Sequence, residues 1–414
     1  MQTEPLWLCP AKLPTAKGAL PRLVWREARY IPGLYKIFDE ILVNALDNRQ
    51  RDPVNMDEIS VDIEPKTGKT TIRNTGRGIP VRRHETEDVW IPEMIMGSLF
   101  SGSNFDDTQK KTVGGRHGFG AKLTNLFSTE FSVQTLDSSE GLMYTQHWSD
   151  NMSVRSEPVI EAVDASRSDF TTVSFTPDLA RFGVKELHSD MLGIFRRRVY
   201  EAAATAYPAR VLLDGRQLHL QGLPDLAAMH TSGQRLKAKQ FAFVEASARW
   251  RVGACVSPIG SFCPVAYVNG VATPRGGTHV NHVASQLLAE LCPALSKALK
   301  LSPEAAEALT PARLRPHLML FVDCSIDNPE FDSQSKEALT TPPAKFGGLC
   351  RLPDSFVRSV AAMDGLRELV REATARRDER MLAKRTRQLG GESSVNLDVP
   401  KLEDAELAGG PRSS

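Results

Sequence analysis

The stretch FDEILVNALDN, residues 38–48, has the pattern of an amphipathic helix with an unusual polar side. At about 100° per residue its apolar side chains fall on one face, at Phe38, Ile41, Leu42 and Ala45. The opposite side carries Glu40, Asn44 and Asp47, with Asn48 at its edge. Taken alone, this stretch allows two interpretations. It is either a solvated helix face, or a set of a carboxylate and amides at i and i+4 that holds a metal ion and a water.

The composition of the whole chain is that of an ordinary globular protein. Its 414 residues predict two domains, with three possible, and 41% are hydrophobic and 24% charged. The 51 basic and 50 acidic residues balance, so the bulk charge attracts neither nucleic acid nor a membrane surface. Any contact with nucleic acid would need a local patch.

The cysteines and the hydropathy pattern indicate an intracellular, soluble protein without a membrane partner. The six cysteines are dispersed and form no C-x-x-C pair, which argues against structural zinc and a disulfide framework. No apolar run reaches the roughly 18 residues that a membrane span needs. The N-terminus has no apolar leader followed by a cleavage site.

The first 230 residues predict an α+β layer sandwich. Residues 1–30 are irregular apart from a short strand in RLVWREARY, and the helix around 34–48 must end before Pro53. Alternating patterns predict strands at 58–64 and 69–74, and three more in an antiparallel meander between 129 and 177. The remaining expected elements are helices at 91–100, 121–128 and 185–207, a polar Gly-rich loop at 101–120, and a strand pair around Asp214-Gly215.

A second, smaller α/β domain is predicted after a polar stretch at 225–240, which marks a change of domain. Its expected strands lie near 242–256, 262–269 and 316–325, with helices at 278–299 and 353–363. A charged helix follows at 366–388. We therefore expect domains at 1–230 and 231–390, and a linker at 391–414.

The segment GGRHGFGAK, residues 114–122, places glycines directly before a helix. Glycine lets a backbone approach a ligand closely, and the free N–H groups of a helix N-terminus favour an anion. The segment matches neither a P-loop nor a dinucleotide-binding fingerprint. It is a phosphate cradle or a flexible surface turn, and Lys122 in the first helical turn is expected to face solvent.

Two further segments are ambiguous when taken singly. In RNTGRGIP, residues 73–80, an Asn at a strand end followed by G-x-G either seats a flat heterocycle or forms a turn. In NPEFDSQSKEAL, residues 328–339, Gln334 and Lys336 occupy a loop, where a lysine is ordinarily solvated.

Taken in order, GLYKIFDEILVNALDNRQRDP, NTGRGIP, GGRHGFGAKLTNLFS and NPEFDSQSKEAL resemble the N-terminal ATPase region of eukaryotic type IIA DNA topoisomerase. The similarity extends from about residue 30 to residue 405. It implies the GHKL (Bergerat) nucleotide-binding sandwich, shared with gyrase B and MutL. It also implies a following transducer domain of the ribosomal protein S5 domain 2-like type.

The resemblance implies ATP and Mg²⁺ as cofactors and assigns a role to each matching residue. Glu40 would be the general base, Asn44 would ligate Mg²⁺, and Asn48 would lie near the ribose or phosphates. Asn74 would bond the adenine edge, and Gln334 and Lys336 would reach the γ-phosphate from the transducer. Ser103 and Asn104 would contact ribose or phosphate. The β- and γ-phosphates would be wrapped by the backbone of Arg116, His117, Gly118, Phe119, Gly120, Ala121 and Lys122.

The same resemblance implies an ATP-dependent homodimer that acts as a gate for duplex DNA in a nuclear enzyme. A MutL-like repair ATPase and a nucleotide-binding module that no longer hydrolyses remain as alternatives. The Arg-rich helix at 371–387 either lines a DNA cavity or is a solvated linker with i,i+4 pairs.

The chain departs from the family pattern in several places. His117 stands where the family usually has Asn, which could make a contact pH-sensitive, and Gly102 stands where Ser is common. The family's N-terminal strap, TOPRIM signature and DNA-cleaving domain are not found in this sequence. We therefore expect weak dimerisation and ATP hydrolysis without DNA cleavage.

Overall fold

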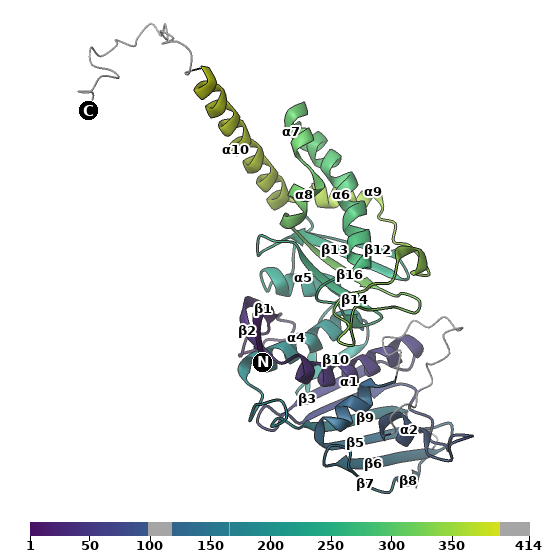
Figure 1. The fold of residues 1–414 in the computed structure, drawn as a ribbon. Coiled ribbons are helices and arrows are strands. Elements are labelled where there is room, and N and C mark those ends of the chain that lie inside the picture. The colour runs from purple at the N-terminus through teal and green to yellow at the C-terminus, as the bar shows by residue number, and fades with distance from the viewer. Residues whose placement is uncertain (98–117, 165, 390–414) are drawn as a thin grey trace, which may run out of the picture. The chain divides into compact units, whose positions relative to one another are not determined.

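The computed structural model describes residues 1–97, 118–164 and 166–389. Met1–Leu366 form one compact unit, and the described residues from Arg367 belong to another. The larger unit contains two main sheets, each with its own helices (Figure 1). The α+β architecture is therefore as predicted, and the boundary at residue 230 stays a prediction.

The first main sheet has nine strands: β3 (Glu58–Ile63), β4 (Thr70–Thr75), β5 (Ser128–Asp137), β6 (Leu142–Ser149), β7 (Val154–Arg155), β8 (Val159–Ala162), β9 (Phe170–Pro177), β10 (Arg210–Leu213) and β11 (Arg216–Leu218). Their order is β11-β10-β3-β4-β9-β5-β6-β7, with β8 also paired to β6. Only the β10–β3 pair among these is parallel. The predicted hairpin at Asp214-Gly215 is confirmed, and both residues have positive φ.

The predicted simple meander between 129 and 177 is wrong in its strand order. All three stretches are strands, but β9 pairs with β5 and β4 and does not follow β6 in the sheet. Val159–Ala162, which the sequence pattern did not single out, occupies the other side of β6. The last stretch therefore crosses to β5, where Phe175 lies opposite Phe131.

The helices of this sheet place the polar stripe of residues 38–48. They are α1 (Pro32–Arg51), α2 (Ile91–Gly97), α3 (Gly120–Leu126) and α4 (Ser189–Thr205). Helix α1 starts with Pro32 at its N-terminus and ends two residues before Pro53. The rings of Phe38 and Phe195 stack at 4.2 Å and 7°, which packs α1 on α4.

The N-terminal residues are more regular than predicted. Strand β1 (Gln2–Leu8) pairs along its whole length with β2 (Val24–Tyr30), which was predicted. The Trp7 ring packs against Trp25 at 5.2 Å and against His230 at 5.1 Å. These aromatic contacts are tertiary, and Pro5 breaks the local strand signal, so the pattern alone missed β1.

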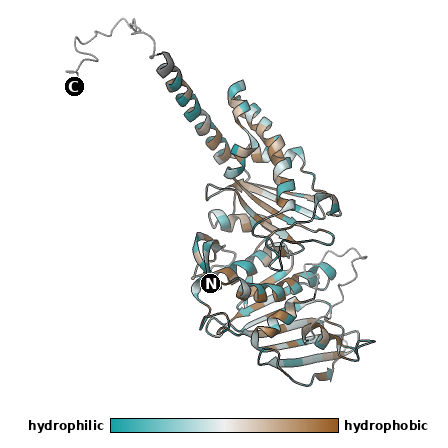
Figure 2. Ribbon diagram, viewed as in Figure 1, coloured by the Kyte–Doolittle hydropathy of each residue, from teal (hydrophilic) through white to brown (hydrophobic). Residues whose placement is uncertain are grey.

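The second main sheet has the order β12-β13-β16-β14-β15, with β14 and β16 parallel. Its strands are β12 (Phe241–Ser247), β13 (Trp250–Val256), β14 (Cys263–Val268), β15 (Val271–Ala272) and β16 (Leu318–Cys324). The strands expected near 242–256 are β12 and β13, which pair as an antiparallel hairpin. Every residue of the central β16 is buried, and Figure 2 shows the hydrophobic colour along this sheet.

The helices of the second sheet include one that the polar sequence at 225–240 did not predict. They are α5 (Leu223–Thr231), α6 (Thr278–Leu299), α7 (Pro303–Ala308), α8 (Pro311–Leu314) and α9 (Asp354–Ala361), with short 3-10 turns at Arg315–His317 and Pro343–Lys345. The polar pattern of 225–240 did not predict α5, most of whose residues are buried, and a change of domain in this stretch stays a prediction. The buried carboxylate of Asp225 accepts two hydrogen bonds from the exposed guanidinium of Arg235, at 3.0 and 3.1 Å, so a polar residue of this segment still packs inside.

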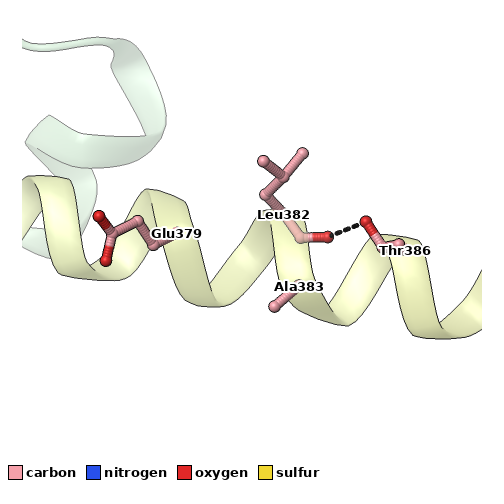
Figure 3. Close-up of a pocket in the computed structure, with 4 residues that line it drawn as sticks. All are labelled: Glu379, Leu382, Ala383 and Thr386. Atoms are coloured by element: carbon pink, nitrogen blue, oxygen red, sulfur yellow. Dashed lines mark hydrogen bonds between the residues drawn. The ribbon is translucent and has the colours of Figure 1, made fainter. Parts of the chain in front are cut away.

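The charged segment forms α10 (Asp364–Leu389), as predicted. Figure 3 shows a pocket on this helix, lined by Glu379, Leu382, Ala383 and Thr386, with Thr386 bonded to the Leu382 carbonyl. None of the four is a predicted site residue.

Among the residues that the structure describes, no helix has the length and apolar character needed to cross a membrane.

Candidate functional site

The polar side of α1 is enclosed by the protein. The exposed fractions of Glu40, Asp47 and Asn48 are 3%, 5% and 8%. Asn44 lies between them on the same side and is half-buried. A solvated helix face is therefore excluded, and the alternative of a built polar site remains.

Glu40 is the centre of this polar cluster. Its Oε1 accepts a hydrogen bond from Lys336 Nζ at 3.0 Å and lies 2.8 Å from Lys36 Nζ. Burial alone would raise the pKa of Glu40, but the two ammonium groups hold it below its usual value. The carboxylate is therefore ionised at neutral pH.

Lys336 reaches Glu40 from a loop of the second sheet. The loop is fastened to the start of α6, since Thr278 N donates to Leu339 O and Leu339 N donates to Gly276 O, both at 3.0 Å. Gly277 has φ +129, and a Cβ there would lie 2.3 Å from Leu339 O. Lys336 is 8% exposed, so the general expectation of a solvated lysine is wrong here. Gln334 lies on the same loop with an exposed side chain.

Gly120 brings the glycine segment against Glu40. It begins α3, and a Cβ at this position would lie 2.1 Å from Glu40 Oε2, so a side chain has no room. Thr124 Oγ1 donates to Ile37 O at 2.9 Å and fixes α3 on α1. Phe119 is the N-cap of α3, Ala121 is buried in its first turn, and Gly118 before them has φ +63.

Lys122 contradicts the expectation that it faces solvent. Its side chain is fully buried, and burial lowers its pKa to about 8. The reason is that α3 packs against both α1 and α2, which encloses its first turn. The predicted contacts at Ser103, Asn104, Arg116 and His117, and the departure at Gly102, lie outside the described residues.

Two amides meet at the other end of the stripe. Asn48 Nδ2 and Asn74 Nδ2 both donate to the Thr75 carbonyl, at 3.3 and 2.9 Å. Asn74 is 7% exposed, at the end of β4. The two glycines that follow lie close against neighbouring chain and leave no room for a side chain. A Cβ on Gly76 would lie 2.6 Å from Met56, and one on Gly78 would lie 2.3 Å from Leu136 O.

These positions define an elongated site along α1. Glu40, Asn44 and Asn48 are four residues apart, so each step rises about 6 Å along the axis and the row spans about 12 Å. One end carries the carboxylate, the Lys336 ammonium and the Gly120 backbone. The other end carries two amides. Such a site suits a long ligand with an anionic end and a hydrogen-bonding end.

The residues suited to a metal are oxygen donors. In residues 1–97, 118–164 and 166–389, no three His, Cys, Asp or Glu side chains gather to hold an ion. The Asn44 amide oxygen is a hard donor of the kind that Mg²⁺ accepts, and Mg²⁺ commonly completes its shell with water and substrate phosphate. The donor chemistry fits a shared protein–ligand magnesium site.

Sequence reasoning missed three charged residues beside Glu40. Lys36 precedes Glu40 by four residues, and the i,i+4 rule could have identified it. Asp39 is 2% exposed and accepts a hydrogen bond from Arg198 Nε at 2.7 Å. No local signal joins Asp39 to Arg198, because they are 159 positions apart.

Comparisons with known proteins agree with this geometry. The family model described as histidine kinase-, DNA gyrase B- and HSP90-like ATPase matches residues 30–181, and the DNA gyrase B model matches residues 225–389. The mitochondrial DNA topoisomerase 2 of Dictyostelium discoideum is 41% identical over 94% of this chain and 30% of its own length. DNA topoisomerase 2 of Penicillium chrysogenum is 40% identical over 93% of this chain and 24% of its own length. The chain thus spans a quarter to a third of these relatives.

Solved structures extend the likeness to three dimensions. The ATPase and transducer domains of DNA topoisomerase II from Balamuthia mandrillaris superpose with a TM-score of 0.81 at 38% identity, covering 91% of this chain and 92% of that one. The ATPase region of Saccharomyces cerevisiae topoisomerase II gives 0.77 at 36% identity, covering 89% and 91%. By its fold and these comparisons, the chain belongs to the DNA topoisomerase II family, in its region of GHKL ATPase and transducer domains.

Proposed function

We propose that this chain binds Mg-ATP along α1 and hydrolyses it, as the ATP-operated part of a DNA topoisomerase. The observation that carries the proposal is the contact between Glu40 and Lys336, at 3.0 Å, against the Gly120 backbone. It joins a general base, a cation and a close backbone approach in one place. Phosphoryl transfer needs these for positioning and for neutralising charge.

Each residue of the site has a distinct task in this proposal. Glu40 orients the attacking water and accepts its proton, and its lowered pKa keeps it ionised at neutral pH. Lys336 offers its ammonium to the γ-phosphate from the transducer loop, and Gln334 acts beside it. Asn48 and Asn74 serve the ribose and adenine end. Nucleotide contacts are also assigned to Ser103 and Asn104, and to the segment Arg116, His117, Gly118, Phe119, Gly120, Ala121 and Lys122.

Asn44 is the residue that would hold Mg²⁺. The ion would supply positive charge between the phosphates and so help to neutralise the transition state. The half-buried amide sits between Glu40 and the Asn48 end of the stripe, where the phosphates of a nucleotide laid along α1 would pass.

The wider activity belongs to the same proposal. We infer that the chain dimerises when it binds ATP and that the dimer is a gate for duplex DNA during strand passage. The support is the family and the names of its relatives, DNA topoisomerase 2. We propose a nuclear location for this chain, because that location is typical of the family, although one relative is mitochondrial.

The test is steady-state ATP hydrolysis across a protein concentration series. Glu40→Gln should lower kcat by about 10²–10⁴-fold, as for loss of a general base, while a fluorescent non-hydrolysable ATP analogue still binds. Lys336→Ala should also collapse turnover, and turnover of the unaltered chain should rise with concentration if the dimer is the active form.

Lys345→Ala is the matched control, because Lys345 is an exposed lysine of the same part of the chain. It should hydrolyse ATP like the unaltered protein. Turnover that survives Glu40→Gln would remove Glu40 from the role of base. Turnover that is weak, independent of concentration and unaffected by Lys336→Ala would leave a module that binds nucleotide.

A further inference from the structure

A largely buried row of alternating charges runs through the site. Arg198 Nε lies 2.7 Å from Asp39, and Lys36 Nζ lies 3.8 Å from Asp39 and 2.8 Å from Glu40. Lys336 closes the row at 3.0 Å from the same Glu40 oxygen. The proposed chemistry uses Glu40 and Lys336, and it leaves the other three groups unexplained.

Arg198 connects α1, the helix that carries Glu40, to the second sheet. Its side chain is fully buried on α4, and its Nη2 donates to the Gly270 carbonyl at 2.7 Å. Gly270 lies in the turn between β14 and β15. Its φ is +78, and a Cβ there would lie 3.1 Å from Leu46 of α1. One guanidinium therefore ties α1, α4 and this turn together.

The turn is in contact with the chain that leads to Lys336. The buried Asn269 side chain accepts a hydrogen bond from Ile326 N and donates one to Ile326 O, both at 2.9 Å. Ile326 follows β16 and precedes the 328–339 loop by two residues. The position of Lys336 is thus linked through Ile326, Asn269 and Gly270 to Arg198, and from there to the helix that carries Glu40.

Lys36 is shared between two carboxylates. At 2.8 Å from Glu40 and 3.8 Å from Asp39, it is closer to Glu40. Arg198 already neutralises Asp39 and holds the pKa of that buried carboxyl below its usual value, against the effect of burial. Without the guanidinium, the Asp39 charge would be uncompensated in the interior, and Lys36 is the nearest cation that could move to it.

We propose that Arg198 is a positioning residue for ATP hydrolysis. It fixes the Glu40 carboxylate relative to the Lys336 ammonium across the two sheets, and by satisfying Asp39 it reserves Lys36 for Glu40. The proposal rests on the proposed ATPase function. Glu40 is faced by Lys36 on its own helix and by Lys336 on its loop. The Arg198–Asp39 pair is faced by Lys36 and Tyr35 on α1, Glu201 on α4 and the Tyr267 ring on β14.

The experiment separates positioning from stability with a double-mutant cycle. The variants are Arg198→Met, Asp39→Asn and the two together, since a buried ion pair replaced as a pair costs far less stability than one broken on one side. Arg196→Met is the control, because Arg196 on the same helix bonds Ala11 O and lies 4.0 Å from Asp214, and neither partner belongs to the row of charges. For each variant, Tm, KM for ATP, kcat and the pH profile of kcat are measured.

The proposal expects three results together. Arg198→Met lowers Tm strongly, and the double variant recovers a large part of the loss. Both lower kcat by about 10- to 100-fold with little change in KM, because the reacting groups are misplaced. In Arg198→Met the acid limb of kcat moves to higher pH by about one unit, because Glu40 loses Lys36 to Asp39. In the double variant the acid limb returns to its pH in the unaltered protein, because the Asp39→Asn change leaves no charge to draw Lys36 away from Glu40.

Each contrary result is distinct. A double variant with recovered Tm and the kcat of the unaltered protein would make the pair purely structural and overturn the inference. The inference would also be overturned if Arg198→Met folds and its kcat and the acid limb of its pH profile are unchanged. If that single variant does not fold, the double variant still decides, because positioning predicts low kcat in a protein of near-normal Tm. An unaltered chain that binds the analogue but never hydrolyses ATP would overturn the proposed function itself.

Discussion

Gly120 illustrates how much a single position controls at the residue scale. The close approach of its backbone to Glu40 requires the absence of a side chain, because a Cβ would lie 2.1 Å from the carboxylate oxygen Oε2 and 2.8 Å from Cδ. Real Cβ atoms do not come so near, so any side chain here must displace the proposed base. The glycine therefore shapes the end of the site that holds Glu40 as directly as the charged residues do.

Gly120→Ala should lower kcat for ATP by about 10-fold or more, because a shift of the base by a fraction of an ångström spoils its alignment. Binding of a non-hydrolysable analogue should change less than turnover. Gly348→Ala is the control, since that glycine has ordinary φ and its nearest neighbour would be Arg249 Cδ at 3.7 Å. An alanine at position 120 with unchanged kcat would show that Glu40 tolerates displacement.

At the scale of elements, Asp190 joins the N-terminal sheet to α4. It lies in the first turn of α4, accepts a hydrogen bond from Arg26 Nη2 at 2.7 Å, and accepts another from Arg29 N at 2.9 Å. Burial raises the pKa of Asp190, but these hydrogen bonds outweigh burial and hold it below 3.8. A carboxylate in the first turn also interacts favourably with the helix dipole.

Asp190→Asn should lower the free energy of unfolding by about 1–2 kcal/mol at pH 7, the cost of losing charge-assisted hydrogen bonds. A depressed folded pKa stabilises the fold above the unfolded value of about 3.9 and loses that effect as pH falls through the folded pKa. The difference from the unaltered protein should therefore shrink below about pH 4, in denaturant titrations at several pH values. Asp62→Asn, at an exposed position of β3, should give no such trend.

Elements were well predicted where their signal is local. The amphipathic helix in 185–207, the strands at 58–64 and 69–74 and the Asp214-Gly215 hairpin follow from periodicity and turn chemistry that a few neighbouring residues determine. The misses have tertiary causes. Strand β1 is held by the packing of Trp7 against Trp25 and His230. In α5, the buried Asp225 carboxylate accepts a hydrogen bond from Arg235.

At the scale of the whole molecule, the thiols report on its packing. All six cysteines are free and buried. Burial raises the pKa of every one of them, to about 11 for Cys350 and about 12 for Cys255. Since the thiolate is the reactive form, both access and ionisation protect them.

The folded chain should react slowly with a thiol reagent at pH 8, and all six thiols should react once the chain is unfolded in denaturant. Added reductant should leave Tm unchanged, because no disulfide links these cysteines. Mass spectrometry after pulse labelling measures both states. Rapid labelling of several cysteines in the native protein would mean that the two sheets open far more readily than their packing implies.

The sequence by itself determined the class of this protein and the residue types of its site. Helix and strand periods, glycine positions and the order of four segments sufficed, because each is a property of a short stretch. Tertiary structure alone decided that Lys336 is buried on Glu40, 296 positions away, that Lys122 is enclosed, and that Arg198 joins Asp39 to Gly270. Such contacts depend on how whole elements pack, and charge buried by packing has no trace in the local pattern of residues.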